Sequence, residues 1–168
     1  MKNNVMRIAG RLGLAILITT SAYPTGGAQT DCQGQFRVQY FKNKELKGEP
    51  HFTSCERSID NDWGRFGPTK IINSGKSDAP GERKSVGNDR FSVRWEGRFQ
   101  FQARSYTFEA RADDGLRVWV DDQLIIDEWR VQGVSRFTAQ QNMTAGFHKI
   151  KVEYYEEDGG AVASLKWR

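Results

Sequence analysis

Apolar and polar residues alternate through much of the chain, and this two-residue period constrains the fold more than any other feature. The segment FSVRWEG puts Phe91, Val93 and Trp95 on one face of an extended chain and polar side chains on the other. This pattern is expected of a half-buried antiparallel strand. Such a strand must bury its apolar face against another layer, so the pattern predicts packed β-sheets with Trp95 in the core.

A second alternating region is interrupted by the sequence Asp-Asp-Gly at residues 113–115. Apolar residues alternate before it, at Tyr106 and Phe108, and again after it, from Leu116 to Val120. A tight turn at residues 121–123, which contains a second acidic pair, then predicts a hairpin. No extended stretch has the 3.6-residue recurrence of a helix, so the sequence predicts an all-β antiparallel sandwich or barrel.

These segments closely resemble the anthrax protective-antigen-type domain, called the PA-fourteen domain. The segments HKIKVEYYEEDGG at residues 148–160 and SLKW at residues 164–167 share the resemblance. The resemblance covers nearly all of the chain after residue 28. It implies a jelly-roll-like fold in which two antiparallel sheets pack face to face. It also implies a carbohydrate-binding module of the kind that is fused to glycosidases, adhesin stalks, proteases and toxins.

The N-terminus has the layout of a secretory signal peptide. Lys2, Arg7 and Arg11 precede or overlap the start of a short apolar stretch, which small residues follow. We expect residues 1–28 to be removed, which leaves residues 29–168 as a single domain that is secreted, periplasmic or at the cell surface. No second apolar stretch follows, so we expect no membrane span after leader removal.

The charge balance argues against a nucleic-acid partner. The leader holds three of the 25 basic residues and none of the 21 acidic ones, so the remaining chain has a net charge of +1. Nucleic-acid binding would need a clustered basic face. Residues 73–90 are rich in Gly, Ser, Asp, Pro, Lys and Arg, and we expect them to form a long exposed loop.

Cys32 and Cys55 are the only cysteines. Two cysteines in an exported chain most often form a disulfide, and we expect one here. Closing a loop of this size stabilises a fold by about 3 kcal/mol in the chain-entropy model. A zinc site is not expected, because two cysteines and His51 are too few ligands at no recognised spacing.

The Asp-Asp-Gly unit is the strongest candidate for a ligand site. Asp113 and Asp114 are adjacent, so they can address one ligand only if the backbone departs from the pleat, which Gly115 permits. In the sugar-binding adhesins that this domain resembles, the matching aspartates are joined by a cis peptide and hold a calcium ion that contacts sugar hydroxyls. The alternative is that both carboxylates accept hydrogen bonds from loop N–H groups and only brace the loop.

Three further residues complete the predicted carbohydrate-binding site. Calcium takes six to eight oxygen ligands, and Asp158, in the turn EEDGG, is the candidate for a further metal ligand beside Asp113 and Asp114. Trp119 alternates out of phase with the apolar face of its strand, and Trp129 follows an acidic pair. Both are candidates for stacking against a sugar ring.

The sequence therefore predicts a secreted, non-enzymatic carbohydrate-binding module that uses calcium and recognises a glycan or polysaccharide. Neither His51 nor His148 lies in a known catalytic motif, and His148 fits a structural role at the start of a strand. One alternative is a structural or protein-interaction module of an envelope assembly, with an envelope protein as its partner. The other is a small hydrolase, which would need an open cleft that holds two carboxylates with perturbed pKa values.

Overall fold

The computed structural model describes residues 32–72 and 81–168, so the expected leader lies outside the described residues. Within those ranges the secondary structure consists of β-strands, and no helix occurs, as predicted. The strands are β1 (Phe36–Phe41), β2 (Phe52–Glu56), β3 (Ile59–Gly64), β4 (Thr69–Ile72), β5 (Glu82–Ser85), β6 (Ser92–Phe101), β7 (Arg104–Asp113), β8 (Gly115–Val120), β9 (Gln123–Glu128), β10 (Ser135–Met143), β11 (Gly146–Tyr155) and β12 (Ala161–Trp167).

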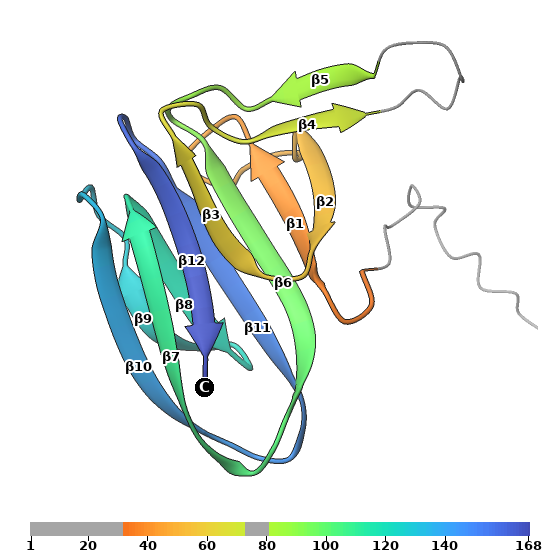
Figure 1. Ribbon diagram of the computed structural model, residues 1–168, viewed down its shortest axis with the longest axis vertical. Coiled ribbons are helices and arrows are strands. Elements are labelled where there is room, and N and C mark those ends of the chain that lie inside the picture. The colour runs from red at the N-terminus through yellow and green to blue at the C-terminus, as the bar shows by residue number, and fades with distance from the viewer. Residues whose placement is uncertain (1–31, 73–80) are drawn as a thin grey trace, which may run out of the picture.

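Two antiparallel sheets pack face to face, which confirms the predicted sandwich (Figure 1). The six-stranded sheet has the order β2-β1-β6-β11-β8-β9, and the four-stranded sheet has the order β10-β7-β12-β3. A separate ribbon of β4 and β5 lies at one end of the sandwich. No helix of the described residues is long and apolar enough to cross a membrane.

The predicted alternation places side chains on the expected faces. Phe91, Val93 and Trp95 are fully buried, and so are Leu116 and Val118 on the neighbouring part of the six-stranded sheet. The inward faces of both sheets together form one apolar core. The sequence period is therefore the direct cause of the two-layer architecture.

Trp95 connects the core to the strand that carries the disulfide. Its indole Nε1 donates a hydrogen bond to Glu56 Oε2 at 3.0 Å, and the Tyr40 hydroxyl donates to the other oxygen of the same carboxylate. The neighbouring residue, Cys55, forms the predicted disulfide with Cys32, with 5.5 Å between the two Cα atoms. The polar edge of the Trp95 ring is thus satisfied inside the core, as buried indoles require.

Part of the expected loop at residues 73–90 is a strand. Glu82–Ser85 forms β5 and pairs with β4 in an antiparallel ribbon, whereas residues 73–80 lie outside the described residues. The sequence Glu-Arg-Lys-Ser is polar on both faces, so it carries no alternation by which a strand could be recognised. Its hydrogen-bonding partner, not its own pattern, makes it a strand.

The acidic turn between β8 and β9 has the expected structural role. Asp121 and Asp122 have positive φ angles of 46° and 67°, as a two-residue hairpin turn requires. Asp121 Oδ1 also accepts a hydrogen bond from the Lys149 backbone N–H at 2.8 Å, and its Oδ2 contacts the ring of His148. His148 therefore supports the turn rather than a catalytic site.

Replacing Trp95 by alanine should lower the free energy of unfolding by about 3 to 5 kcal/mol, because the fully buried ring leaves a cavity and Glu56 Oε2 loses its hydrogen-bond donor. Urea unfolding of the purified domain measures this change. Trp119→Ala is the matched control: that ring is half-buried under the Lys151 ammonium, so its loss should cost about 1 kcal/mol or less. Equal losses in the two variants would contradict the assigned strand phase.

Candidate metal centre

The pairing of β11 with β8 decides which loops meet at the candidate site. Tyr155 is the last residue of β11, and it pairs with Gly115, the first residue of β8. Glu156 follows Tyr155, and Asp114 precedes Gly115, so the antiparallel register brings these two carboxylates to the same end of the sheet. The Glu156 backbone N–H is fixed there by a hydrogen bond to the Phe91 carbonyl oxygen at 2.9 Å.

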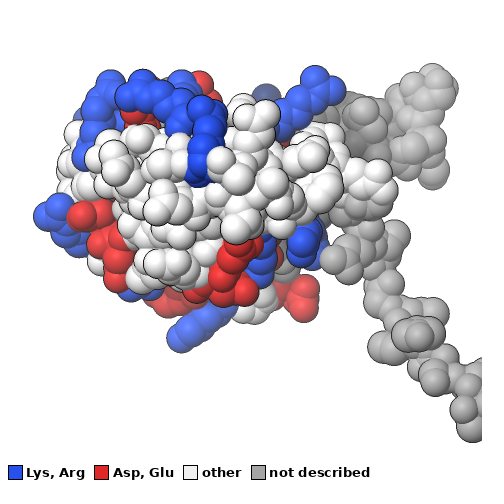
Figure 2. Space-filling view, turned by 90° about the horizontal axis from the view of Figure 1, so that it is seen from below, with Lys and Arg blue, Asp and Glu red and all other residues white. Residues whose placement is uncertain are grey.

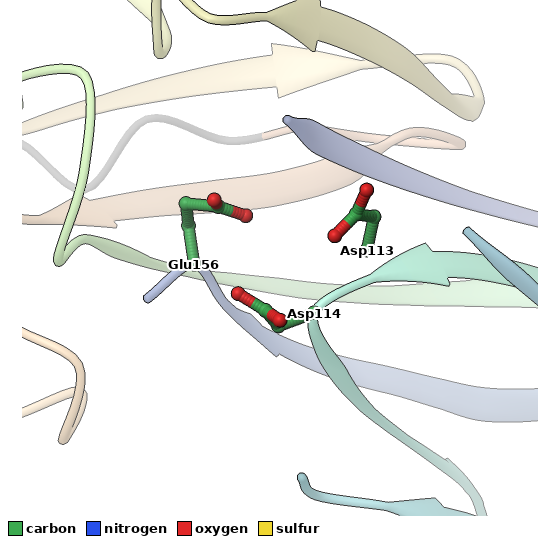
Figure 3. Close-up of side chains that lie close together, drawn as sticks. All are labelled: Asp113, Asp114 and Glu156. Carbon is green, nitrogen blue, oxygen red and sulfur yellow. The ribbon is translucent and has the colours of Figure 1, made fainter. Parts of the chain in front are cut away.

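Three carboxylates converge at this end of the sandwich. Asp113, Asp114 and Glu156 each offer one oxygen that lies within 4.8 Å of the other two (Figure 3). Asp113 and Asp114 are joined by a cis peptide bond, as the resemblance implied. Asp114 and Glu156 are buried, whereas Asp113 is half-buried and is the most solvent-exposed of the three.

Glu156 is the most unusual of these groups. Its side chain is fully buried, and only its Oε2 has a hydrogen-bond partner, the Tyr154 hydroxyl at 2.8 Å. Its Oε1 is buried without any partner among the described residues. The pKa of the Glu156 carboxyl is raised to about 8, mainly by burial. The hydrogen bond from Tyr154 lowers this pKa, and the charges of Asp114 and Asp113 raise it.

Asp114 braces two loops with its side chain. Its Oδ1 accepts a hydrogen bond from the Gln132 backbone N–H at 2.9 Å, and its Oδ2 accepts one from the Glu157 backbone N–H at 2.8 Å. The Gln132 side-chain amide donates a hydrogen bond to the Asp114 carbonyl oxygen at 3.1 Å. The loop-bracing role is therefore real for Asp114, although each carboxylate oxygen keeps a second lone pair for another partner.

Asp113 has a different environment from its neighbour. Burial raises the pKa of its carboxyl, the charge of Asp114 raises it further, and a backbone N–H of Val134 opposes both effects. A Cβ atom at Gly160 would lie 3.4 Å from Asp113 Oδ2. Asp113 is also the only one of the three clustered carboxylates that is not fully buried.

The donor set fits a hard divalent cation. All three groups are carboxylates, which calcium prefers and which can bind it through one oxygen or two. The Glu156 carboxylate, whose Oε1 is unpartnered, points toward the other two carboxylates (Figure 3). A buried carboxylate oxygen without a hydrogen-bond donor is stabilised by a cation, and the same cation would offset the repulsion among the three groups.

The structure brings together Asp113 and Asp114 as the sequence predicted, but it does not add Asp158 to them. Asp158 is exposed and is not among the three clustered carboxylates. The third carboxylate of the cluster is Glu156, two residues earlier in the chain. The signal that would have found it is its phase, because it continues the inward positions of Val152 and Tyr154 along β11.

Gly115 is required by a close approach rather than by an unusual φ angle. A Cβ atom at this position would lie 2.0 Å from Cε1 of the Tyr155 ring. Tyr155 in turn packs against Trp129, with ring centroids 4.7 Å apart. Gly115 therefore lets an aromatic pair lie directly beside the carboxylate cluster.

The two candidate stacking residues lie on the outer side of the six-stranded sheet. The Trp119 ring is covered by the Lys151 ammonium, 3.7 Å from the ring centroid. The Trp129 ring lies beside the Arg117 guanidinium, 4.8 Å from its centroid. Both rings thus have a cationic neighbour, and Trp129 is the one that also lies near the cluster, through Tyr155.

A groove of about 460 Å³ is lined by two residues that flank Glu156 in sequence, Tyr155 and Glu157, but by none of the three clustered carboxylates. Trp129 and Tyr155 line it together with Glu157, whose backbone N–H binds Asp114. The remaining wall is polar apart from Leu46, and its cations are paired with acids: Arg94 with Glu153, Arg117 with Asp127, and Lys44 with Glu157. This combination of aromatic faces and fixed polar groups is typical of small-ligand sites.

The chain belongs to the PA14 domain family, whose model matches residues 33–168. It is 34% identical over 133 residues to the anti-sigma-I factor RsgI3 of Acetivibrio thermocellus, a match that covers 78% of this chain and 18% of the relative. The chain thus spans about a fifth of the curated relative it matches.

Two solved structures are similar to this chain in fold. An anti-sigma factor domain-containing protein is 34% identical, with a TM-score of 0.65, over 79% of this chain and 42% of that one. A PA14 sugar-binding domain from an RTX adhesin has the same fold at 21% identity, with a TM-score of 0.61, over 81% of this chain and 90% of the adhesin domain.

Without metal, Glu156→Gln should make the protein more stable than wild type at about pH 8 and leave it unchanged at about pH 5. The folded state holds the Glu156 proton up to a pKa of about 8, whereas the unfolded chain releases it near 4.5. The wild type therefore loses stability as pH rises through this interval, and glutamine does not titrate. Thermal melts in chelator at both pH values measure the difference.

Glu157→Gln is the control for this prediction. The Lys44 ammonium lowers the pKa of Glu157. This carboxylate therefore contributes its stability above the unfolded pKa, and its loss should weaken the fold at pH 8. Greater stability of both variants at high pH would indicate a general charge effect instead.

Proposed function

We propose that this domain binds glycans outside the cytoplasm through a calcium ion held by Asp113, Asp114 and Glu156. The observation that carries the proposal is the buried Glu156 carboxylate with one unpartnered oxygen, which faces two further carboxylates. A calcium ion bound there would supply Lewis-acid sites for sugar hydroxyls. Its other ligands would come from backbone carbonyls, water or the sugar itself.

The surroundings of the cluster suit a sugar. Sugars present vicinal hydroxyls and apolar C–H faces, so a cation beside an aromatic ring meets both demands. Trp129 and Tyr155 supply the aromatic surface, and the groove next to them is wide enough for a small ligand. The PA14 domain of the RTX adhesin, which shares this fold, is described as sugar-binding, and this supports the same ligand class here.

The location of the perturbed carboxyl groups favours binding over hydrolysis. A general acid must reach the bond that it protonates, within hydrogen-bond distance of the substrate. Glu156 has the most strongly raised carboxyl pKa, but its side chain is fully buried. The geometry therefore suits a group that holds a cation rather than one that donates a proton to a substrate.

The disulfide between Cys32 and Cys55 supports an oxidising, extracytoplasmic location. Relatives at about a third identity are named as anti-sigma factors. In such a protein this domain would act as the outer module, and a protein partner is the second candidate function on that ground. The two candidates differ in their ligand, because only the first requires the metal.

Calcium should raise the melting temperature of the wild type, and a glycan array should give signals that chelator removes. Asp113→Asn should abolish both effects with little change in metal-free stability, because this carboxylate lies at the surface of the cluster. Asp114→Asn should abolish them and also lower the free energy of unfolding by about 1 to 3 kcal/mol, since asparagine has one acceptor oxygen and one of the two backbone N–H groups then faces an NH₂ group.

Asp158→Asn is the matched control for this series. Asp158 lies in the same loop as Glu156 but is exposed and outside the cluster, so its variant should bind calcium like the wild type. Loss of calcium binding in Asp158→Asn alone would restore Asp158 as the third ligand. An unchanged melting temperature with calcium in all four proteins, combined with no glycan signal, would refute the proposal.

A further inference from the structure

A second polar groove lies on the outer face of the four-stranded sheet, away from the aromatic groove. Its volume is about 340 Å³, and two arginines, Arg111 and Arg136, contribute to its wall. Arg111 belongs to β7 and is half-buried, and Arg136 belongs to β10 and is exposed. Neither residue belongs to the carboxylate cluster.

The sheet register places these two arginines directly opposite each other. Arg136 pairs with Arg111 across β10 and β7, and Arg111 pairs with Ser164 on β12. Like charges directly opposite on neighbouring strands destabilise a sheet. A bound anion would offset this repulsion.

The acids of this groove do not compensate the two arginines. Asp60 lies 3.5 Å from the Lys166 ammonium, and Glu109 lies 2.6 Å from the Arg168 guanidinium. In the part of the chain that the structure describes, no carboxylate lies within ion-pair distance of Arg111 or Arg136. The groove thus holds two cationic groups in excess of its own paired charges.

Basic side chains also gather on one side of the sandwich. Figure 2, which views the molecule of Figure 1 from below, shows lysine and arginine side chains gathered in an arc along its upper edge. That edge corresponds to the side of the sandwich that faces the reader in Figure 1, where the four-stranded sheet lies. A field of one sign over a groove concentrates ligands of the opposite charge.

We propose that Arg111 and Arg136 together bind an oxyanion of an acidic polysaccharide, either a uronate carboxylate or a sulfate. The guanidinium fork matches both oxyanions with paired hydrogen bonds. The hydroxyl groups of Thr138 and Ser164 line the same groove and can donate to the anion. The polysaccharide class rests on the proposed glycan function, but the site does not need calcium.

The two sites lie close enough to act on one chain. Arg111 and Asp113 are two residues apart on β7, on the same face of the strand, which is a separation of about 7 Å. An acidic polysaccharide bound to the arginines would pass near the exposed edge of the calcium cluster. The arginine pair would then select for charged sugars among those that the calcium ion can hold.

Isothermal titration calorimetry in chelator and low salt tests the arginine site by itself. The ligands are trigalacturonate, its fully methyl-esterified form and a sulfated oligosaccharide. The wild type should bind one or both of the acidic ligands and not the ester. Arg111→Gln and Arg136→Gln should each weaken that binding about tenfold or more, and sodium chloride should weaken it in the wild type.

Arg98→Gln is the matched control. Arg98 is exposed and pairs in register with Lys149 on the other sheet, so the variant removes the same charge away from the groove and should change the affinity less than about twofold. Arg136→Gln should melt no lower than the wild type, because it removes a like-charge contact.

Three outcomes would overturn the proposal: binding of neither acidic ligand, equal binding of the ester, or an equal loss in Arg98→Gln. Acid-dependent binding in chelator, without any calcium-dependent array signal, would support the arginine site and refute only the calcium site.

Discussion

The antiparallel pairing of β11 with β8 is the constraint on which the candidate site depends. It places Tyr155 against Gly115 and so brings Glu156 and Asp114 to one end of the sandwich. The same strand, β11, also pairs with β6, whose inward face carries Trp95 and the rest of the core. A slip of one residue would turn the apolar face of β11 to solvent. Core burial therefore fixes the position of the carboxylates.

Loop bracing by Asp114 is compatible with the proposed cation binding, because the two roles need not use the same carboxylate oxygens. Asp114 uses its carboxylate to hold the backbone at Gln132 and Glu157. Glu156 has no such partner for Oε1, and its carboxyl is uncharged below a pKa of about 8. The braced loops hold the carboxylates close together, and their mutual repulsion makes the cluster favourable only when a proton or a cation is present.

Two features of the site depend on the tertiary structure rather than on local sequence pattern. Asp158 and Glu156 lie in the same acidic turn, and only the strand phase of β11 separates the exposed residue from the buried one. The pairing of Arg111 with Arg136 joins residues 25 positions apart in sequence, through a register that alternation does not specify. Outside the site, the strand β5 cannot be recognised from its own sequence, because both of its faces are polar and its pairing with β4 alone defines it.

By itself the sequence determined the architecture, the disulfide, the core positions of Phe91, Val93 and Trp95 and the location of the Asp-Asp-Gly loop. These features follow from local rules, because side-chain period and turn chemistry act over a few residues. Tertiary structure alone decided that Glu156 joins the aspartates and that two arginines share a groove. These juxtapositions depend on which strands become neighbours and in what register, and burial of the whole core sets that choice.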